Sequence, residues 1–105
     1  MRSKSHDEAM SELYRRDPAL ALEVVNDILR EGDQPELLSV LRQLAQAFGG
    51  MQAVATHAEL NPTQLYRTLS PGGNPSLASM MAILKAMGLR LAIQPLEVPA
   101  PACAA

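Results

Sequence analysis

The segment "LNPTQLYRTLS" carries three side chains that can bind DNA bases: Thr63, Gln64 and Arg67. Leu65 and Leu69 stand four residues apart, so they define the buried side of a predicted helix and leave the three polar side chains on the outside. Arginine can donate two hydrogen bonds to guanine, glutamine can pair with adenine, and threonine can contact a base or a thymine methyl group. The pattern therefore favours a helix that reads bases in the DNA major groove.

Two Asn-Pro pairs, Asn61-Pro62 and Asn74-Pro75, predict where helices begin in this part of the chain. Asparagine is favoured just before a helix, and proline is favoured at its first position. We therefore expect one short helix at residues 62–69 and another at residues 75–87. The intervening "SPGGNP" follows a helix and lacks the Lys-Ser/Thr of a phosphate-binding loop, so we interpret it as a connector.

A short helix is also predicted just before the first Asn-Pro pair, at "MQAVATHA", residues 51–58. The small Ala55 would let a second helix cross closely, and Glu59-Leu60-Asn61 would form the turn. Two short helices, a tight turn and apolar anchors are typical of a helix-turn-helix, here at residues 51–70. Gln52 and the free N–H groups beside it could hold a DNA phosphate. Glycine is commoner at the position of Glu59, where positive φ is usual, so we expect mild strain there.

Three further helices are predicted upstream, at residues 7–16, 18–31 and 35–48. Asp17-Pro18 marks the start of the second of these and Gly32 its end. Downstream, residues 89–94 alternate between apolar and polar side chains, which predicts a half-buried β-strand. Because no second strand is evident, we expect an antiparallel partner from a second copy of the chain.

Length and composition limit the kinds of protein that this chain can be. The 105 residues suffice for one domain, and the 48% of hydrophobic side chains are mostly of the kinds that favour helices. The sequence has neither a signal peptide nor an apolar run near the roughly 18 residues of a membrane span, and its single cysteine cannot form an internal disulfide, so we expect a cytoplasmic protein. We expect a flexible N-terminus at residues 1–6, a single helical domain at 7–95 and a disordered tail at 96–105.

Charge is distributed unevenly along the chain. The formal net charge is −2, with five basic and eight acidic side chains in residues 1–35, and four basic and three acidic ones in residues 36–105. Any nucleic-acid site should therefore lie in the second part and make few phosphate contacts per chain. The acidic surface of residues 7–33 is either a solvated face or, through Glu23, Asp27 and Glu31, a docking surface for a basic partner.

No group of side chains suggests catalysis. His57 has no second histidine, cysteine or paired carboxylate at metal-ligand spacing, and Cys103 has no partner for nucleophilic chemistry. We therefore expect no enzymatic activity, no metal site and no cofactor. From helix spacing alone, residues 51–69 could also be two helices of an all-α bundle whose exposed face is merely polar.

The stretch "MQAVATHAELNPTQLYRTLSPGGNPSLASMMAILKAMGLRLAIQP" resembles the signature of the addiction-module antidote proteins, HigA-like antitoxins with a Cro/C1-type, lambda-repressor-like helix-turn-helix. The combination "LYRTLS-x-x-GNP" is far more specific than a generic helix-turn-helix. The resemblance implies a homodimeric repressor that binds a palindromic operator in double-stranded DNA and neutralises a cognate RelE/ParE-like toxin. By position, it implies that bases are read by Thr63, Gln64 and Arg67, assisted at the DNA backbone by Gln52, Asn61 and Tyr66.

We therefore expect an all-α domain of five or six helices with one C-terminal strand, acting as a dimeric, DNA-binding antitoxin. A dimer doubles the phosphate contacts and places two reading helices about one DNA turn apart, ~34–36 Å. Two alternatives stay open. The chain could be a stand-alone Cro/C1-type repressor without a toxin partner, or a protein-interaction module in which the 62–69 helix docks a protein groove.

Overall fold

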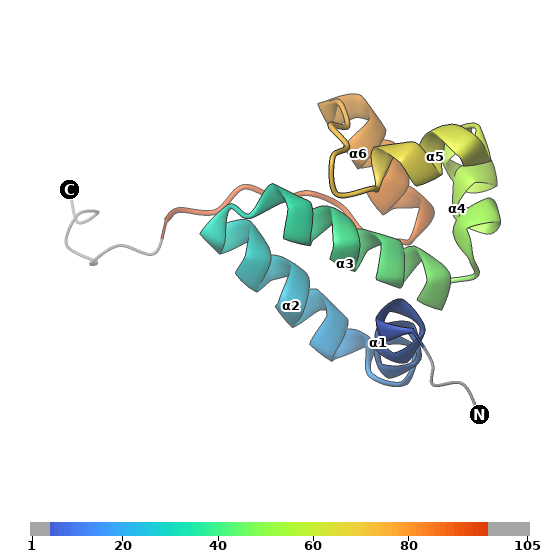
Figure 1. Ribbon diagram of the computed structural model, residues 1–105. Helices are drawn as coiled ribbons and strands as arrows, with labels where there is room; N and C mark the ends of the chain where they lie inside the picture. Colours follow the sequence, from blue (N-terminus) through green and yellow to red (C-terminus); the bar gives the residue numbers. More distant parts are fainter. Residues whose placement is uncertain (1–4, 97–105) are drawn as a thin grey trace.

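The computed structural model describes residues 5–96, and this part of the chain is entirely helical apart from its connections (Figure 1). Six helices follow one another: α1 (His6–Arg16), α2 (Pro18–Glu31), α3 (Gln34–Ala47), α4 (Met51–Ala58), α5 (Pro62–Thr68) and α6 (Leu77–Ala86). The prediction of an all-α fold with five or six helices is confirmed for these residues. None of the described helices combines the length and apolar character needed to cross a membrane.

The first two helices begin and end at local signals in the sequence. At the start of α1, the Ser5 hydroxyl accepts a hydrogen bond from the Glu8 N–H and the Glu8 carboxylate accepts one from the Ser5 N–H, both at 3.1 Å. This reciprocal cap begins the helix slightly earlier than predicted. The Asp17 carboxylate caps α2 by accepting from the Leu20 N–H at 3.2 Å, and Gly32 ends α2 with φ of 78°. Both signals at α2 agree with the prediction.

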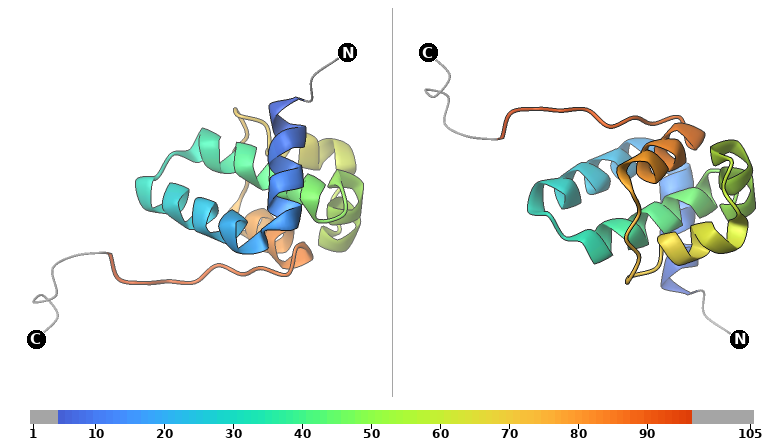
Figure 2. Two further views of the ribbon diagram at one scale, coloured as in Figure 1. Left: turned by 90° about the horizontal axis from the view of Figure 1, so that it is seen from below. Right: turned by 90° about the horizontal axis from the view of Figure 1, so that it is seen from above.

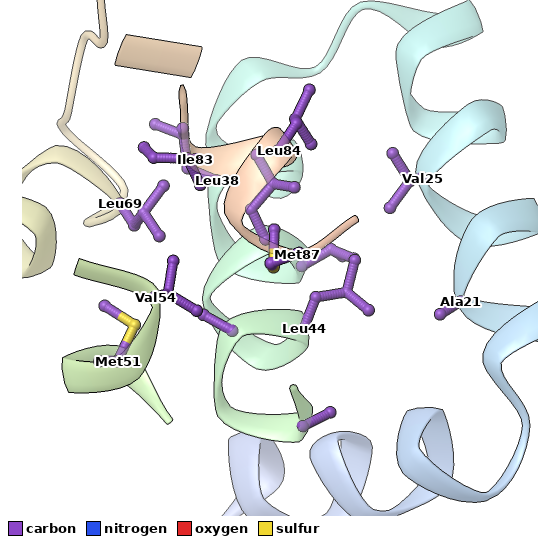
Figure 3. Packing of buried hydrophobic residues seen from close by; sticks show 14 of the residues in the cluster. Ala21, Val25, Leu38, Leu44, Met51, Val54, Leu69, Ile83, Leu84 and Met87 are labelled. Carbon is purple, nitrogen blue, oxygen red and sulfur yellow. The ribbon is translucent and has the colours of Figure 1, made fainter. Parts of the chain in front are cut away.

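Helix α3 lies at the centre of the fold. It contacts α1, α2 and α4, and Figure 2 shows α2 running beside it while α1 crosses both. Leu38, Leu41 and Leu44 of α3 are almost completely buried. Figure 3 shows apolar side chains of α2, α3, α4 and α6 gathered around the same space. The core therefore joins the N-terminal helices to the group formed by α4, α5 and α6.

The second Asn-Pro pair does not begin a helix, so that prediction was wrong. Helix α6 begins at Leu77, and the Ser76 hydroxyl caps it by accepting from the Ser79 N–H at 3.0 Å. Asn74 and Pro75 precede this cap in a non-helical segment. Serine is as good a capping residue as asparagine, and here the later of two competing signals determines the start.

The predicted strand at residues 89–94 is also absent from the described part of the chain. Leu89 packs against the core and donates its N–H to the Leu84 carbonyl at 2.8 Å, which closes α6. Beyond it Leu91 is 40% exposed and Ile93 is fully exposed. A strand needs a neighbour for its backbone groups, and no other segment of residues 5–96 offers one. The expected flexible N-terminus and disordered tail fall mostly on residues 1–4 and 97–105, which lie outside the described residues.

Gly73 packs closely against the backbone at the end of α5. A Cβ atom at Gly73 would lie 2.0 Å from the Thr68 carbonyl oxygen, so Gly73→Ala must displace backbone. We expect it to lower the free energy of unfolding by roughly 2 kcal/mol or more. At Gly72 a Cβ would meet nothing within 4 Å. Gly72→Ala is therefore the matched control and should change stability by less than about 1 kcal/mol in urea unfolding; equal losses in both variants would contradict this packing.

Candidate nucleic-acid interface

The first Asn-Pro pair sets the start of α5, as predicted. The Asn61 side-chain oxygen accepts hydrogen bonds from the backbone N–H groups of Thr63 at 2.8 Å and Gln64 at 3.3 Å, and Pro62 occupies the first helical position. This cap satisfies two N–H groups that have no partner inside the helix. It uses the oxygen of the Asn61 amide and leaves the amide nitrogen as a donor that points to no protein acceptor among residues 5–96.

The two sides of α5 differ as the leucine spacing predicts. Leu65 is completely buried, as is Leu69 just after the helix. Thr63, Gln64 and Arg67 are exposed, and Tyr66 is 53% exposed. Within residues 5–96 the side chains of these four outward residues make no hydrogen bond or ion pair. Their donors and acceptors are therefore available to an external ligand.

Glu59 has left-handed backbone geometry, with φ of 59° and ψ of 42°, as its place in the turn predicted. Its N–H donates to the Thr56 carbonyl at 3.1 Å, and the Leu60 N–H donates to the Ala55 carbonyl at 2.8 Å. These two bonds end α4 and turn the chain sharply into α5. Leu60 packs against the core, and Ala55, at the predicted crossing of the two helices, is completely buried.

The N-terminus of α4 has no side-chain cap. Gly50 precedes the helix and has no side chain that could accept from the first N–H groups. Gln52, in the first turn, is exposed. Free N–H groups at a helix start and a nearby amide donor suit an anionic oxygen such as that of a DNA phosphate. The structure thus places Gln52 and the outward side of α5 on consecutive, contacting helices.

An ion pair between α1 and α3 supports the other end of α5. The Arg42 guanidinium donates from Nη1 to the Leu69 carbonyl at 3.1 Å and from Nε to the Asp7 carboxylate at 3.0 Å. The Gln43 side chain donates to the second oxygen of Asp7, also at 3.0 Å. These residues are far apart in the chain, so no local pattern could reveal the arrangement. Arg42 thereby connects α1 to the carbonyl that follows α5.

The same contacts lower the pKa of the Asp7 carboxyl. The hydrogen bond from Gln43 is the largest cause and Arg42 adds to it, while partial burial acts in the opposite direction. Both donors favour the charged form of the carboxylate over the protonated one. The Asp7 carboxylate is therefore held in its charged form as part of the support of α5.

His57 is exposed near the end of α4. It lines a shallow cleft between α4 and α6 together with Glu59 and Lys85. Among residues 5–96 no three potential metal ligands gather in one place. Cys103 lies outside the described residues.

Glu59 should carry a small conformational cost that glycine would remove. A left-handed conformation is unfavourable for a residue with a Cβ atom, so we expect Glu59→Gly to raise the free energy of unfolding by roughly 0.5–1 kcal/mol. Lys85→Gly, inside α6, is the control and should instead lower it by about 1 kcal/mol. Thermal unfolding of both variants measures the difference. A loss of stability in Glu59→Gly would show that the side chain contributes more than the strain costs.

Asp7→Asn should destabilise the fold in a manner that depends on pH. Because the pKa of Asp7 is lowered on folding, its contribution is present above the ordinary value of about 3.9 and is lost as pH falls through the folded value. We expect Asp7→Asn to lose roughly 1 kcal/mol at pH 7, and its difference from wild type to shrink below about pH 4. Asp27→Asn, which breaks the exposed pair with Arg30, should cost less than about 0.5 kcal/mol. A difference that stays constant down to pH 2–3 would contradict the role of the charge.

Comparison with known proteins places the chain in a family. Residues 6–95 match the family described as "probable addiction module antidote protein". A stretch of 70 residues is 36% identical to an uncharacterized protein of Haemophilus influenzae and covers 67% of this chain and 71% of that protein. No solved structure matches the chain. Because the family match includes all six helices and the complete outward side of α5, the chain belongs to the family of probable addiction module antidote proteins.

Proposed function

We propose that this protein is the antitoxin of a type II toxin–antitoxin module, that it represses its own operon by binding operator DNA, and that it neutralises a RelE/ParE-like toxin. Membership of the antidote family supports the antitoxin role. The outward side of α5, with Thr63, Gln64 and Arg67 exposed and unpaired within the described residues, is the observation that supports DNA binding. In this proposal α4 and α5 form a Cro/C1-type helix-turn-helix of the HigA-like kind.

Base reading in this proposal belongs to α5. Arg67 donates to the edge of a guanine, Gln64 pairs with an adenine, and Thr63, nearest the start of the helix, contacts a base or a thymine methyl group. The reading helix must keep its register on the DNA while these contacts form. Buried Leu65 and Leu69 hold its inner side, so the outer side chains project from a supported helix.

Contacts to the DNA backbone come from the rim of the same surface. The uncapped start of α4 and Gln52 bind one phosphate, and the free amide nitrogen of Asn61 and the Tyr66 hydroxyl bind sugar-phosphate groups beside the reading helix. Such contacts position the protein without specifying sequence. They rely on hydrogen-bond donors more than on charge, which suits a chain with a formal net charge of −2.

A homodimer completes the proposal, because one copy offers few positive charges to the DNA. Two copies double the phosphate contacts and present two α5 helices to a palindromic operator, with half-sites ~34–36 Å apart. Repression and toxin neutralisation both require only binding, so we propose that the protein has no enzymatic activity and needs no cofactor. We also propose that it is cytoplasmic.

Two alternative functions make different predictions. A stand-alone repressor would share the DNA site but bind no toxin. An interaction module would bind protein through α5 and no DNA.

The role of Arg67 can be tested with DNA from the protein's own promoter. We expect Arg67→Ala to weaken operator binding by roughly 1–3 kcal/mol and to relax specificity at one base pair of each half-site, because the bidentate contact is lost. Arg16→Ala removes an equal charge from an exposed position on α1 and is the matched control. Gel shifts across a salt series measure both. Unchanged affinity in Arg67→Ala would reject its assignment, and wild-type binding that does not weaken with salt would favour the interaction module.

A further inference from the structure

The carbonyl oxygen of Leu69, just after the last turn of α5, accepts a hydrogen bond from a side chain of another helix. No backbone N–H among residues 5–96 donates to it, as is common for a carbonyl at a helix end. Its donor is Nη1 of Arg42 in α3, at 3.1 Å. Figure 1 and Figure 2 both show this end of α5 beside α3. Arg42 therefore supplies the partner that the helix end lacks.

The Arg42 side chain is itself held in one orientation. Its Nε donates to one oxygen of the Asp7 carboxylate at 3.0 Å, and the other oxygen accepts from the Gln43 side chain at 3.0 Å. The guanidinium is planar and carries its donors in a fixed fork, so it can bind two acceptors at once in a way that the ammonium of lysine cannot. One side chain thus links α1, α3 and the end of α5.

Helix α5 has few other connections to α3. Among the helices, α5 packs mainly against α4. Two side chains of α3 donate hydrogen bonds to the chain that follows α5: Arg42 to the Leu69 carbonyl, and Gln34 to the Gly73 carbonyl at 3.2 Å. A helix of seven residues depends on such tertiary contacts for its order. Removing Arg42 should therefore loosen the end of α5 relative to α3.

This end of α5 carries the candidate base-reading arginine. Arg67 lies two residues before Leu69, in the last turn of the helix. Recognition of a base edge requires the side chain to be placed within about 0.5 Å of the productive position. A shift of the helix end would therefore move the Arg67 side chain away from the base that it reads.

Arg42 is poorly suited to bind a DNA phosphate itself. Its charge is balanced by the Asp7 carboxylate, and its Nε and Nη1 donors are both directed at acceptors within the protein. Its side chain is only 22% exposed. A phosphate would have to compete with a carboxylate that is already in place. Any contribution of Arg42 to DNA binding should therefore act through α5.

We propose that Arg42, oriented by Asp7, is a positioning residue for DNA recognition: it holds the end of α5 so that Arg67 meets its base. This inference rests on the proposed function, in which α5 reads the operator. It makes operator affinity depend on α3 and α1, although none of the proposed DNA contacts comes from either helix.

The first test measures operator binding across a salt series. Arg42→Met removes both hydrogen bonds, whereas Arg42→Lys keeps a charge beside Asp7 but lacks the forked donors. We expect affinity to fall roughly tenfold in Arg42→Met and roughly threefold in Arg42→Lys, with the dependence of log affinity on log salt unchanged. A loss of about 1 in that slope would reveal a direct phosphate contact and overturn the proposal.

The matched control is Arg30→Met, which removes an arginine from an exposed ion pair on α2. We expect it to change operator affinity by less than about twofold. Unfolding curves show whether each variant is folded at the temperature of the binding measurement. If Arg42→Met does not fold, Arg42→Lys decides the question. An equal loss of affinity in Arg30→Met and Arg42→Lys would contradict the role of Arg42.

A double-mutant cycle separates positioning of Arg67 from a general effect on the fold. If Arg42 acts through Arg67, Arg42→Lys should weaken operator binding by less than about twofold when Arg67 is already replaced in Arg67→Ala. A general loss of folded protein would weaken binding by the same factor in both backgrounds. That equal factor would overturn the proposal.

Amide hydrogen exchange tests the support of α5 without DNA. The Leu69 N–H donates to the Leu65 carbonyl at 2.9 Å, and the Gly32 N–H donates to the Ile28 carbonyl at the end of α2 at 2.8 Å. We expect Arg42→Lys to speed exchange at Leu69 roughly threefold or more and to leave Gly32 as in wild type. If wild type fails to bind the operator, the proposed function falls, and exchange alone decides whether Arg42 holds α5. Unchanged exchange at Leu69 would overturn the inference.

Discussion

The burial of α3 is the constraint on which the rest of the structure depends. Its leucines at 38, 41 and 44 are 0–1% exposed, and the helix contacts α1, α2 and α4. Each such side chain stabilises the fold by roughly 1.5–3 kcal/mol relative to exposure. Because one helix serves as the packing surface for both halves, the acidic N-terminal helices and the candidate reading helix are held in one body. Neither group has a separate core of this size in the described residues.

The position of α5, the candidate reading helix, depends on its contacts with the rest of the domain. A helix of seven residues is too short to be stable by itself. Asn61 caps its start, and Leu65 and Leu69 bury its inner side. Arg42 donates to the Leu69 carbonyl at its end, and Asp7 orients the Arg42 side chain. The polar side chains that face outward therefore project from a support that reaches back to α1. Such support keeps the outward donors at fixed positions, which is what the recognition of base edges requires.

The outward sides of α5 and α2 differ in their chemistry. The outward side of α5 offers hydrogen-bond donors and acceptors with little net charge, which suits specific contacts within a groove. Helix α2 instead exposes Leu22 and Leu29 along one edge and carries the exposed carboxylates of Glu23 and Asp27 along another.

The sequence by itself determined the helical class, the cap at Asn61, the left-handed turn at Glu59 and the inward and outward sides of α5, because each depends on neighbours within one or two turns. It did not determine the start of α6, because both Asn74 and Ser76 are good capping residues and only Ser76 caps the helix. It also did not determine the structure of residues 89–94, because the alternating pattern predicts a strand but does not show whether a neighbouring strand exists. Only the tertiary structure brought Asp7, Arg42 and the Leu69 carbonyl together, and only it formed a groove between Leu29 of α2 and Leu77 of α6. Those arrangements join residues that are far apart in the chain, so they follow from how the helices pack and not from any local pattern.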